Sequence, residues 1–277
     1  MTTQWNDPAE TTSTPAPALA AAPPSPPGGI DYPVRYWVDF PEGPRNRLTV
    51  FFRSLMVMPI FALLVMLTSS NQSWVGLAPL LALMLMILVR GKYPRPWFNW
   101  WVYLVQLSAR VMAYFVSLRD EYPSTDEEQA VHLEMDYPQD DTLNRVLPFV
   151  KWLLAIPHYF LILLLGVASL GAALAMWLGI LFTGRTPRRF FDLVVAVNAW
   201  GLRVQGYAFT LVTDRYPPFS LGFGVSGGTV ALSALIGIVF YVVMIALFLG
   251  FVVGMMDPAM FEPGRGLATP MRGGGFR

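Results

Sequence analysis

The sequence predicts a mainly α-helical, polytopic membrane protein. It is expected to contain two tandem repeats of strand, transmembrane helical hairpin and amphipathic interfacial helix, then one C-terminal transmembrane helix. Hydrophobic residues make up 55% of the 277 residues, charged residues only 13%, and the mean hydropathy is +0.48. Soluble domains carry about 25% charged residues. In addition, three apolar regions are long enough to span a hydrocarbon core of about 30 Å, and the pattern of the first half returns in the second.

The duplication is visible as residues that recur at a nearly constant offset. Because each copy must meet the same folding problem with the same elements, a duplication constrains the architecture before any single motif is considered. We expect two homologous modules of roughly 95 residues, close to the size of a small domain. The recurring residues are Asn46, Arg47, Arg53 and Pro59, which reappear 98 positions later as Asn144, Arg145, Lys151 and Pro157, and Gly91, Arg95, Arg110 and Tyr114, which reappear 93 positions later as Gly184, Arg188, Arg203 and Tyr207.

Composition divides the chain into five segments. Residues 1–30 are rich in Pro, Ala, Thr and Ser and cannot bury enough apolar surface to offset their ordering entropy, so we expect a disordered tail. The first membrane repeat covers 31–123 and the second covers 124–222. A glycine hinge and the final transmembrane helix follow over 223–256, and 257–277 are expected to form a flexible C-terminal tail.

Each repeat opens with a strand pattern. Apolar residues alternate with polar ones over 34–40, and the same alternation returns over 131–137. A period of two residues predicts a β-strand. A further strand is predicted after each amphipathic helix, at 114–118 and 207–212, with a continued helix as the alternative. Because short strands leave unpaired edges, they need a partner, a helix or each other. A small cytoplasmic β element is therefore expected.

The first apolar region predicts a helical hairpin. Residues 48–89 carry one interior charge, Arg53, and are broken by the polar stretch 69–73. The last apolar region, 229–256, is a single uncharged span, and its length suffices for one crossing.

The second apolar region repeats the first. Residues 146–182 have Lys151 in place of Arg53 and a break around Gly166–Gly171, where glycine is typical of a turn. A second hairpin is therefore expected, and the three regions together predict five crossings.

Two further segments, 97–118 and 190–212, are nearly apolar enough to cross as well. In the first, the polar residues form a narrow stripe along the helix, which favours a helix lying in the membrane interface. Basic residues follow each hairpin, at 90–95 and 185–189, and both groups should be cytoplasmic. Interfacial helices permit this, whereas spanning helices would separate the two groups. We expect a multi-pass protein of the cell inner membrane with a cytoplasmic N-terminus.

Several classes of function find no support in the sequence. A net charge of +1 offers no basis for nucleic-acid binding, and the absence of cysteine excludes thiolate metal sites and cysteine nucleophiles. The glycines at 222–228 fit both GxGxxG and GxSxG, but a membrane span follows instead of a βαβ unit. The histidine that a GxSxG serine needs later in the chain is also missing, because the last one is His158. We expect no enzymatic activity, cofactor or metal.

Three ionisable residues lie within the predicted spans. His158 is a functional candidate by default at that depth; the alternative is that it bonds a backbone carbonyl freed by Pro157. Arg53 and Lys151 lie near the starts of their helices and are expected to snorkel to the cytoplasmic headgroups. Binding of anionic lipid is the alternative for these two cations.

The interfacial helices carry a further pair. Arg110 and Arg203 occupy the same place in both copies, each with a tyrosine one turn later, which suggests a paired contact across a pseudo-twofold axis. The complete set of candidate lipid or partner contacts is Arg47, Arg53, Arg95, Arg110, Tyr114, Arg145, Lys151, His158, Arg188, Arg203 and Tyr207.

These residues resemble a known family. The Asn-Arg pair followed by a basic residue and a proline, the Ile156-Pro157-His158 step, the Gly-Arg-x-Pro-Arg turn and the stretch Thr213–Ser220 are similar to the bacterial membrane family catalogued as domain of unknown function 4389. The resemblance covers residues 32–222 as two tandem copies. The second copy is the more typical, since the first has Ile60 where the second has His158. The resemblance implies a polytopic membrane protein and no assigned activity.

The final span holds a candidate packing motif, Gly250-x-x-x-Gly254, which allows close approach of another helix or packing within the chain. A transporter or channel needs polar groups near mid-membrane, and these spans have almost none. We therefore expect a non-enzymatic scaffold or accessory subunit of a membrane complex. Lipid or small-molecule binding or transport ranks second, and a membrane enzyme third. The expected partners are the bilayer, including anionic lipids, and another protein or a second copy at the final helix.

Overall fold

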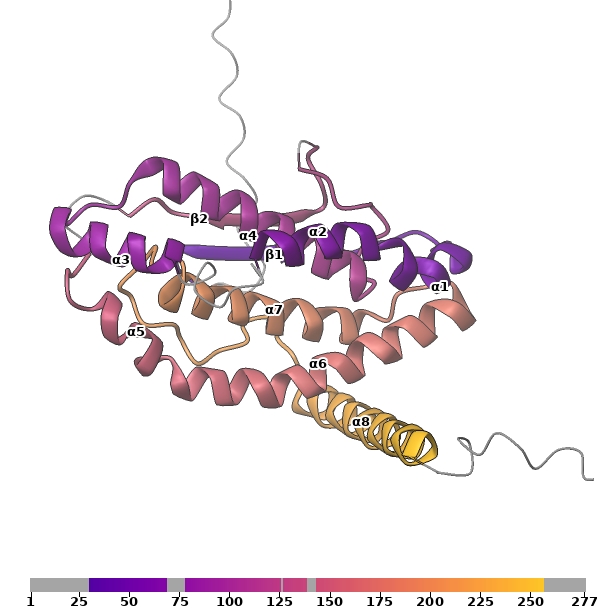
Figure 1. Ribbon diagram of the computed structural model, residues 1–277. Helices are drawn as coiled ribbons and strands as arrows, with labels where there is room; N and C mark the ends of the chain where they lie inside the picture. Colours follow the sequence, from indigo (N-terminus) through magenta and orange to yellow (C-terminus); the bar gives the residue numbers. More distant parts are fainter. Residues whose placement is uncertain (1–29, 69–77, 126, 139–142, 257–277) are drawn as a thin grey trace, which may run out of the picture.

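The computed structural model describes residues 30–68, 78–125, 127–138 and 143–256, which are mainly helical (Figure 1). The predicted tails 1–30 and 257–277 lie outside the described residues, apart from Ile30, and so does the predicted polar break at 69–73. In chain order the elements are β1 (Val34–Val38), α1 (Arg47–Met56), α2 (Met58–Thr68), α3 (Ala78–Arg90), α4 (Arg95–Phe115), β2 (Val131–Met135), α5 (Pro148–Leu154), α6 (Ile156–Thr183), α7 (Arg188–Ala208) and α8 (Gly227–Met256).

The two strands predicted at 34–40 and 131–137 are present, and they pair with each other. β1 and β2 form a two-stranded antiparallel sheet in which Tyr36 lies opposite Leu133 at the centre. α4 covers β2, and Gln106 Nε2 donates a hydrogen bond to the Leu133 carbonyl at 3.1 Å. α4 therefore supplies a partner for one backbone group at the edge of β2, where short strands need one.

The segments after α4 and α7 are not strands. Each helix ends in a turn with one residue in the left-handed conformation, Ser117 at φ 66° and Leu211 at φ 56°. The amides that follow bond back to carbonyls of the last helical turn, as in helix C-caps. The prediction of strands at 114–118 and 207–212 is therefore wrong, because the capping turns use the backbone groups that a strand would need.

The helices pack in layers around the sheet (Figure 1). β1 lies against α7 and β2 against α4, while α7 also packs against α6. One cluster of buried residues joins these elements and draws on both predicted repeats, for example Tyr36 and Val105 from 31–123 and Leu193 from 124–222. The two halves of the chain therefore share a core.

The segments 97–118 and 190–212, predicted to be amphipathic helices, are mostly helical and correspond to α4 and α7. A helix lying in the membrane interface would leave its apolar face to lipid, whereas α7 is buried by β1 and α6 along most of its length. On α4, Gln106 and Arg110 of the polar stripe donate to backbone carbonyls of neighbouring segments. Protein thus covers most of α7, and the interfacial position of 190–212 stays a prediction.

The second predicted hairpin is a single helix. α6 runs for 28 residues through the predicted break at Gly166–Gly171. A Cβ atom at Gly171 would lie 1.8 Å from the carbonyl oxygen of Ser233 on α8, so the two backbones meet at this glycine. Small residues are typical both of turns and of close helix contacts, and here they serve the contact.

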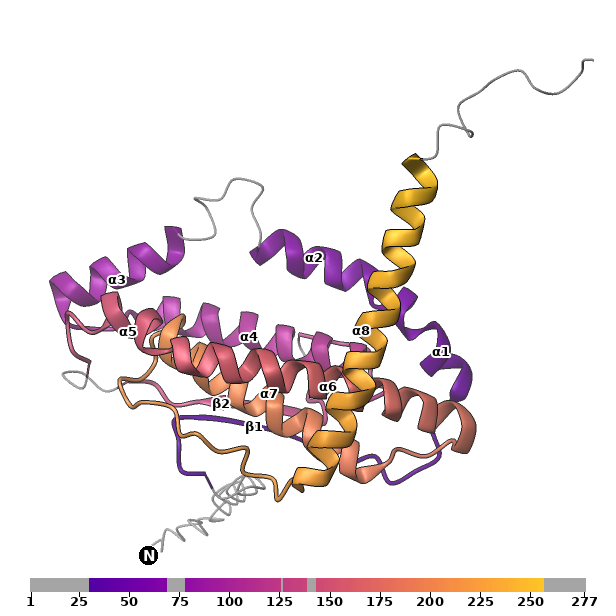
Figure 2. The same cartoon turned by 90° about the horizontal axis from the view of Figure 1, so that it is seen from below.

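Among the described residues, three helical segments are long and apolar enough to cross a membrane, namely Arg47–Met66, Ile156–Thr183 and Gly227–Val253, and Leu80–Arg90 is a shorter apolar helix. Their length and composition indicate a membrane protein, and the number of crossings stays a prediction. α8 crosses α6 and projects beyond the rest of the protein (Figure 2).

Candidate functional site

A buried arginine pairs with a carboxylate in the first half of the chain. Arg53 on α1 is only 1% exposed. Its guanidinium forms an ion pair with Asp120, which follows α4, and lies 4.8 Å from the centre of the Tyr114 ring.

The same three kinds of group meet in the second half. Lys151 on α5 is fully buried, and its Nζ lies 2.6 Å from Asp214 Oδ1 and 5.3 Å from the centre of the Tyr207 ring. Nζ also donates a hydrogen bond to the Thr213 carbonyl at 2.7 Å. Each cluster thus joins the helix that carries its cation to the end of α4 or α7.

The prediction that Arg53 and Lys151 snorkel to lipid headgroups is therefore wrong. Both side chains point into the protein, because Asp120 and Asp214 follow the ends of the helices packed beside them and supply an opposite charge there. A buried cation without such a partner would be costly, whereas removing one member of an existing buried pair is strongly destabilising. The two clusters consequently act as clasps rather than as lipid contacts.

The first clasp contains a second arginine that has no counterpart in the second clasp. Arg45 Nε and Nη2 donate to the Asp120 carboxylate at 2.5 and 2.6 Å, whereas the residue 98 positions after Arg45 is the buried Leu143. Burial raises the pKa of Asp120, but the hydrogen bonds and charges of Arg45 and Arg53 outweigh it and leave that pKa below its ordinary value. Asp120 therefore stays ionised between two guanidinium groups.

Arg110 and Arg203 do not contact each other. Arg110 Nη1 donates to the carbonyl of Ser124, and Arg203 Nη2 donates to the carbonyl of Ser220 at 2.7 Å. The predicted paired contact across a twofold axis is therefore wrong. Each arginine instead donates to a carbonyl in the segment that follows its own helix.

The remaining basic candidates are exposed and lie at the turns after α3 and α6. The guanidinium of Arg145 lies beside Gly91, and that of Arg47 lies beside Gly184. Both glycines adopt positive φ, 66° and 71°, which suits glycine because it has no Cβ.

Two more candidates stack on aromatic rings across the halves of the chain. Arg95 lies 4.7 Å from the centre of the Tyr137 ring, and Arg188 lies 4.6 Å from that of Phe40. The two turns therefore expose basic side chains whose positions are set by contacts with the other half.

His158 lies in an aromatic cluster. It is fully buried, its Nδ1 accepts a hydrogen bond from Trp200 Nε1 at 3.0 Å, and its ring stacks on Phe219 with centroids 4.1 Å apart. Because the indole can only donate, Nδ1 carries no proton and Nε2 does. Pro157 lies in the first turn of α6, where its missing amide frees no carbonyl. The predicted bond to a freed carbonyl is therefore wrong, and His158 joins α6 to α7.

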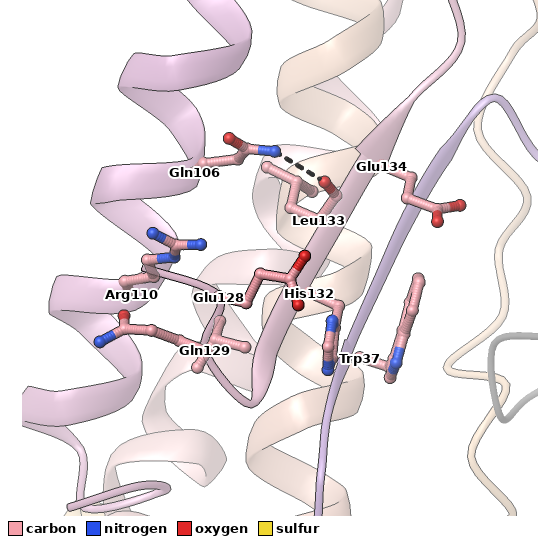
Figure 3. A pocket seen from close by; sticks show the side chains of 9 residues that line it. Trp37, Gln106, Arg110, Glu128, Gln129, His132, Leu133 and Glu134 are labelled. Carbon is pink, nitrogen blue, oxygen red and sulfur yellow. Dashed lines mark hydrogen bonds between the residues drawn. The ribbon is translucent and has the colours of Figure 1, made fainter. Parts of the chain in front are cut away.

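A polar pocket of about 290 Å³ lies between α4 and β2 (Figure 3). Its lining includes both signs of charge, and two of the charged groups already have partners: Arg110 bonds to Ser124 and Glu134 pairs with Arg35 at 3.1 Å. His132 stacks on Trp37 and lies 3.2 Å from the Asp39 carboxylate. We therefore interpret the pocket as a solvated edge of the sheet.

A larger cavity of about 560 Å³ lies between α4, α6 and α7, and the buried Tyr36 of β1 belongs to its lining. Most of its lining is apolar, and the polar groups are uncharged: Tyr36, Ser108, Ser169, Asn198 and Gln205. Burial raises the pKa of Tyr36, whose side chain also bonds to Asn198. The sequence offered no prediction of this cavity, since its walls come from three helices far apart in the chain.

Of the two glycines predicted to mediate packing, Gly250 and Gly254, the structure describes the surroundings of Gly250 alone. A Cβ at Gly250 would meet nothing within 4 Å among the described residues, while the side-chain surroundings of Gly254 lie outside them. The close contact of α8 with α6 occurs instead at Gly237, where a Cβ would lie 2.2 Å from the Val167 carbonyl oxygen. Packing within the chain therefore leaves Gly250 free.

The partners that sequence reasoning missed are Arg45, Asp120, Asp214 and Trp200. A signal for the two aspartates existed, since Asp214 stands 94 positions after Asp120, one more than the 93 that separate the repeated tyrosines Tyr114 and Tyr207. The described residues contain no group of three or more histidine or acidic side chains that could hold a metal ion.

Comparison with known proteins finds a family match for one part of the chain. No curated protein and no solved structure matches it. Residues 147–220, from α5 to the segment after α7, match the family model described as Domain of unknown function (DUF4389), which confirms the resemblance for this part of the second predicted repeat.

Proposed function

We propose that the protein is a non-enzymatic scaffold or accessory subunit of a membrane complex. It would be a multi-pass protein of the cell inner membrane, with its N-terminus and its two basic turns on the cytoplasmic side. Basic residues collect on the cytoplasmic side of membrane proteins, and anionic headgroups would attract the exposed Arg47, Arg95, Arg145 and Arg188.

The proposal includes two tandem copies related by a twofold axis. The strand register supports this, because Tyr36 and Leu133 lie opposite each other and stand 97 positions apart, the offset between the two strand patterns. A twofold axis through this pair exchanges the two pairs on either side of it, so that each remaining pair of the sheet has its counterpart at the offset of 97.

Reciprocal contacts at the basic turns give further support. Arg47 approaches the glycine turn of the second copy as Arg145 approaches that of the first. The stacking of Arg95 on Tyr137 and of Arg188 on Phe40 is reciprocal in the same way. Such a self-complementary interface is that of a twofold homodimer, here within one chain.

The exposure of α8 is the observation that carries the scaffold proposal. Only 6% of its apolar span is buried, and its closest contacts with α6 lie at Ser233 and Gly237, in its first half. Beyond them, a Cβ added at Gly250 would meet nothing within 4 Å in the part of the chain that the structure describes. A transmembrane helix held at one end and free beyond it can pack closely against another helix through small residues. We propose a transmembrane helix of another protein as its partner.

Native purification of the full chain in mild detergent, followed by mass spectrometry of the intact particle, tests the proposal. The wild type should retain a stoichiometric protein partner, and Gly250→Ile should lose it, because a large side chain blocks close approach. Gly228→Ile is the matched control, since a Cβ there also meets nothing within 4 Å and lies in the first turn of α8. A monomeric wild-type particle, a homo-oligomer without another protein, or an unchanged Gly250→Ile complex would contradict the proposal.

A further inference from the structure

We propose that the cavity between α4, α6 and α7 binds one neutral amphiphile, a single apolar chain that carries an uncharged hydrogen-bonding head, such as a monoacylglycerol. This site is independent of the partner proposed for α8. Its volume of about 560 Å³ falls within the range of about 300–1,000 Å³ that is usual for small-molecule sites.

The lining is arranged for an amphiphile. Apolar side chains of all three helices form the walls, for example Met112, Leu170 and Val197, and the uncharged groups of Tyr36 and Asn198 lie among them. Sites for small molecules commonly combine apolar walls with a few polar groups that orient the ligand. An apolar chain with one polar end satisfies both parts of this lining.

The most exposed large side chains of the lining lie on α4. Met112 and Phe115 are about half exposed, while Tyr36, which also belongs to the lining, is buried. The head of the ligand would therefore bond to Tyr36 and Asn198, and its chain would extend toward Met112 and Phe115.

The lining also discriminates by charge. None of its residues is acidic or basic, and the buried cations Arg53, Lys151 and Arg203 are bonded elsewhere. A carboxylate or phosphate head would lose its hydration without gaining a counter-ion, which is costly. The cavity should therefore take a monoacylglycerol and reject the fatty acid with the same chain.

Two glycines allow the cavity to be filled without disturbing the fold. Gly166 on α6 and Gly201 on α7 belong to the lining, and a Cβ at either would meet nothing within 4 Å. Both lie within helices, where replacing glycine favours the helical backbone. Gly201→Leu should therefore fold and occupy the cavity with its own side chain. Gly166→Leu fills the same space from α6.

The test is photolabelling of the full-length protein in detergent micelles, with monopalmitoylglycerol and palmitate that each carry a diazirine on the chain. Monopalmitoylglycerol should label residues of α4 and α6 at the cavity, unlabelled ligand should compete, and palmitate should label at least about tenfold less, a difference of about 1.4 kcal/mol. Gly201→Leu and Gly166→Leu should each lower labelling by about the same factor without lowering the thermal unfolding midpoint.

Gly228→Leu is the matched control, because it adds the same side chain to a helix outside the cavity, and it should label like the wild type. Equal labelling of the wild type and both filled variants would overturn the site. Equal labelling by palmitate and monopalmitoylglycerol would overturn the preference for a neutral head.

Discussion

The contact between α6 and α8 should break when a single methyl group is added to either helix. In Gly171→Ala, the new Cβ would lie 1.8 Å from the Ser233 carbonyl oxygen and 2.6 Å from the Gly237 nitrogen. Both are backbone atoms, so no side chain can rotate away. An ordinary contact of 3.4 Å requires the two backbones to separate by about 1.6 Å, and a gap of about 1 Å already forfeits up to half of the dispersion energy between packed atoms.

The free energy that Gly171→Ala loses by overpacking can be compared with the free energy that alanine gains in helix propensity. Overpacking costs about 1–3 kcal/mol and occasionally more, and a clash between two backbones belongs at the upper end, while alanine in place of a helical glycine returns about 1 kcal/mol. Gly171→Ala should therefore destabilise the protein by about 2 kcal/mol, and the unfolding midpoint should fall by roughly 4–8 °C for a chain of this size.

Thermal unfolding in detergent, followed by tryptophan fluorescence, measures this change. Gly250→Ala is the matched control, because a Cβ there meets nothing within 4 Å, and its midpoint should rise slightly. Gly237→Ala should behave like Gly171→Ala, and the double variant should cost less than the sum, since both residues lie at one crossing. The reasoning is refuted if Gly171→Ala melts at or above the temperature of Gly250→Ala.

Two further predictions concern the clasps. Asp214→Ala leaves Lys151 buried without its carboxylate, and should destabilise the protein by about 3 kcal/mol in the same unfolding assay. Lys151→Met should cost less, because it removes the buried charge, and the reverse order would contradict the clasp. The second prediction is a loss of stability in acid. The pKa of Asp120 is lowered in the folded protein from its ordinary 3.8, so its contribution is present above that value and is lost as the pH falls through the folded pKa. An Asp120→Asn variant should lose less stability between pH 5 and pH 3, and an unchanged pH profile would count against the pairing.

The elements that the sequence predicted are those with a local signal. Alternation over 34–40 and 131–137 identified both strands, and the apolar segments identified most of the helices, because side-chain periodicity reports the backbone conformation directly. The break predicted at Gly166–Gly171 failed because glycine permits a turn and equally permits two helices to touch. Nothing in the local sequence distinguishes the two, since the answer depends on Ser233 of α8.

By itself, the sequence determined an apolar, mainly helical chain, two strand segments and cations at matching positions, since composition and period are properties of consecutive residues. Only the tertiary structure decided where those cations go. Arg53 meets Asp120 across 67 residues, and Lys151 reaches the Thr213 carbonyl across 62. An isolated helix would leave such a side chain free to reach headgroups. The packing of α4 and α7 places Asp120 beside Arg53 and Asp214 beside Lys151. Each cation is then buried with an opposite charge and joins elements of the core instead of reaching the headgroups.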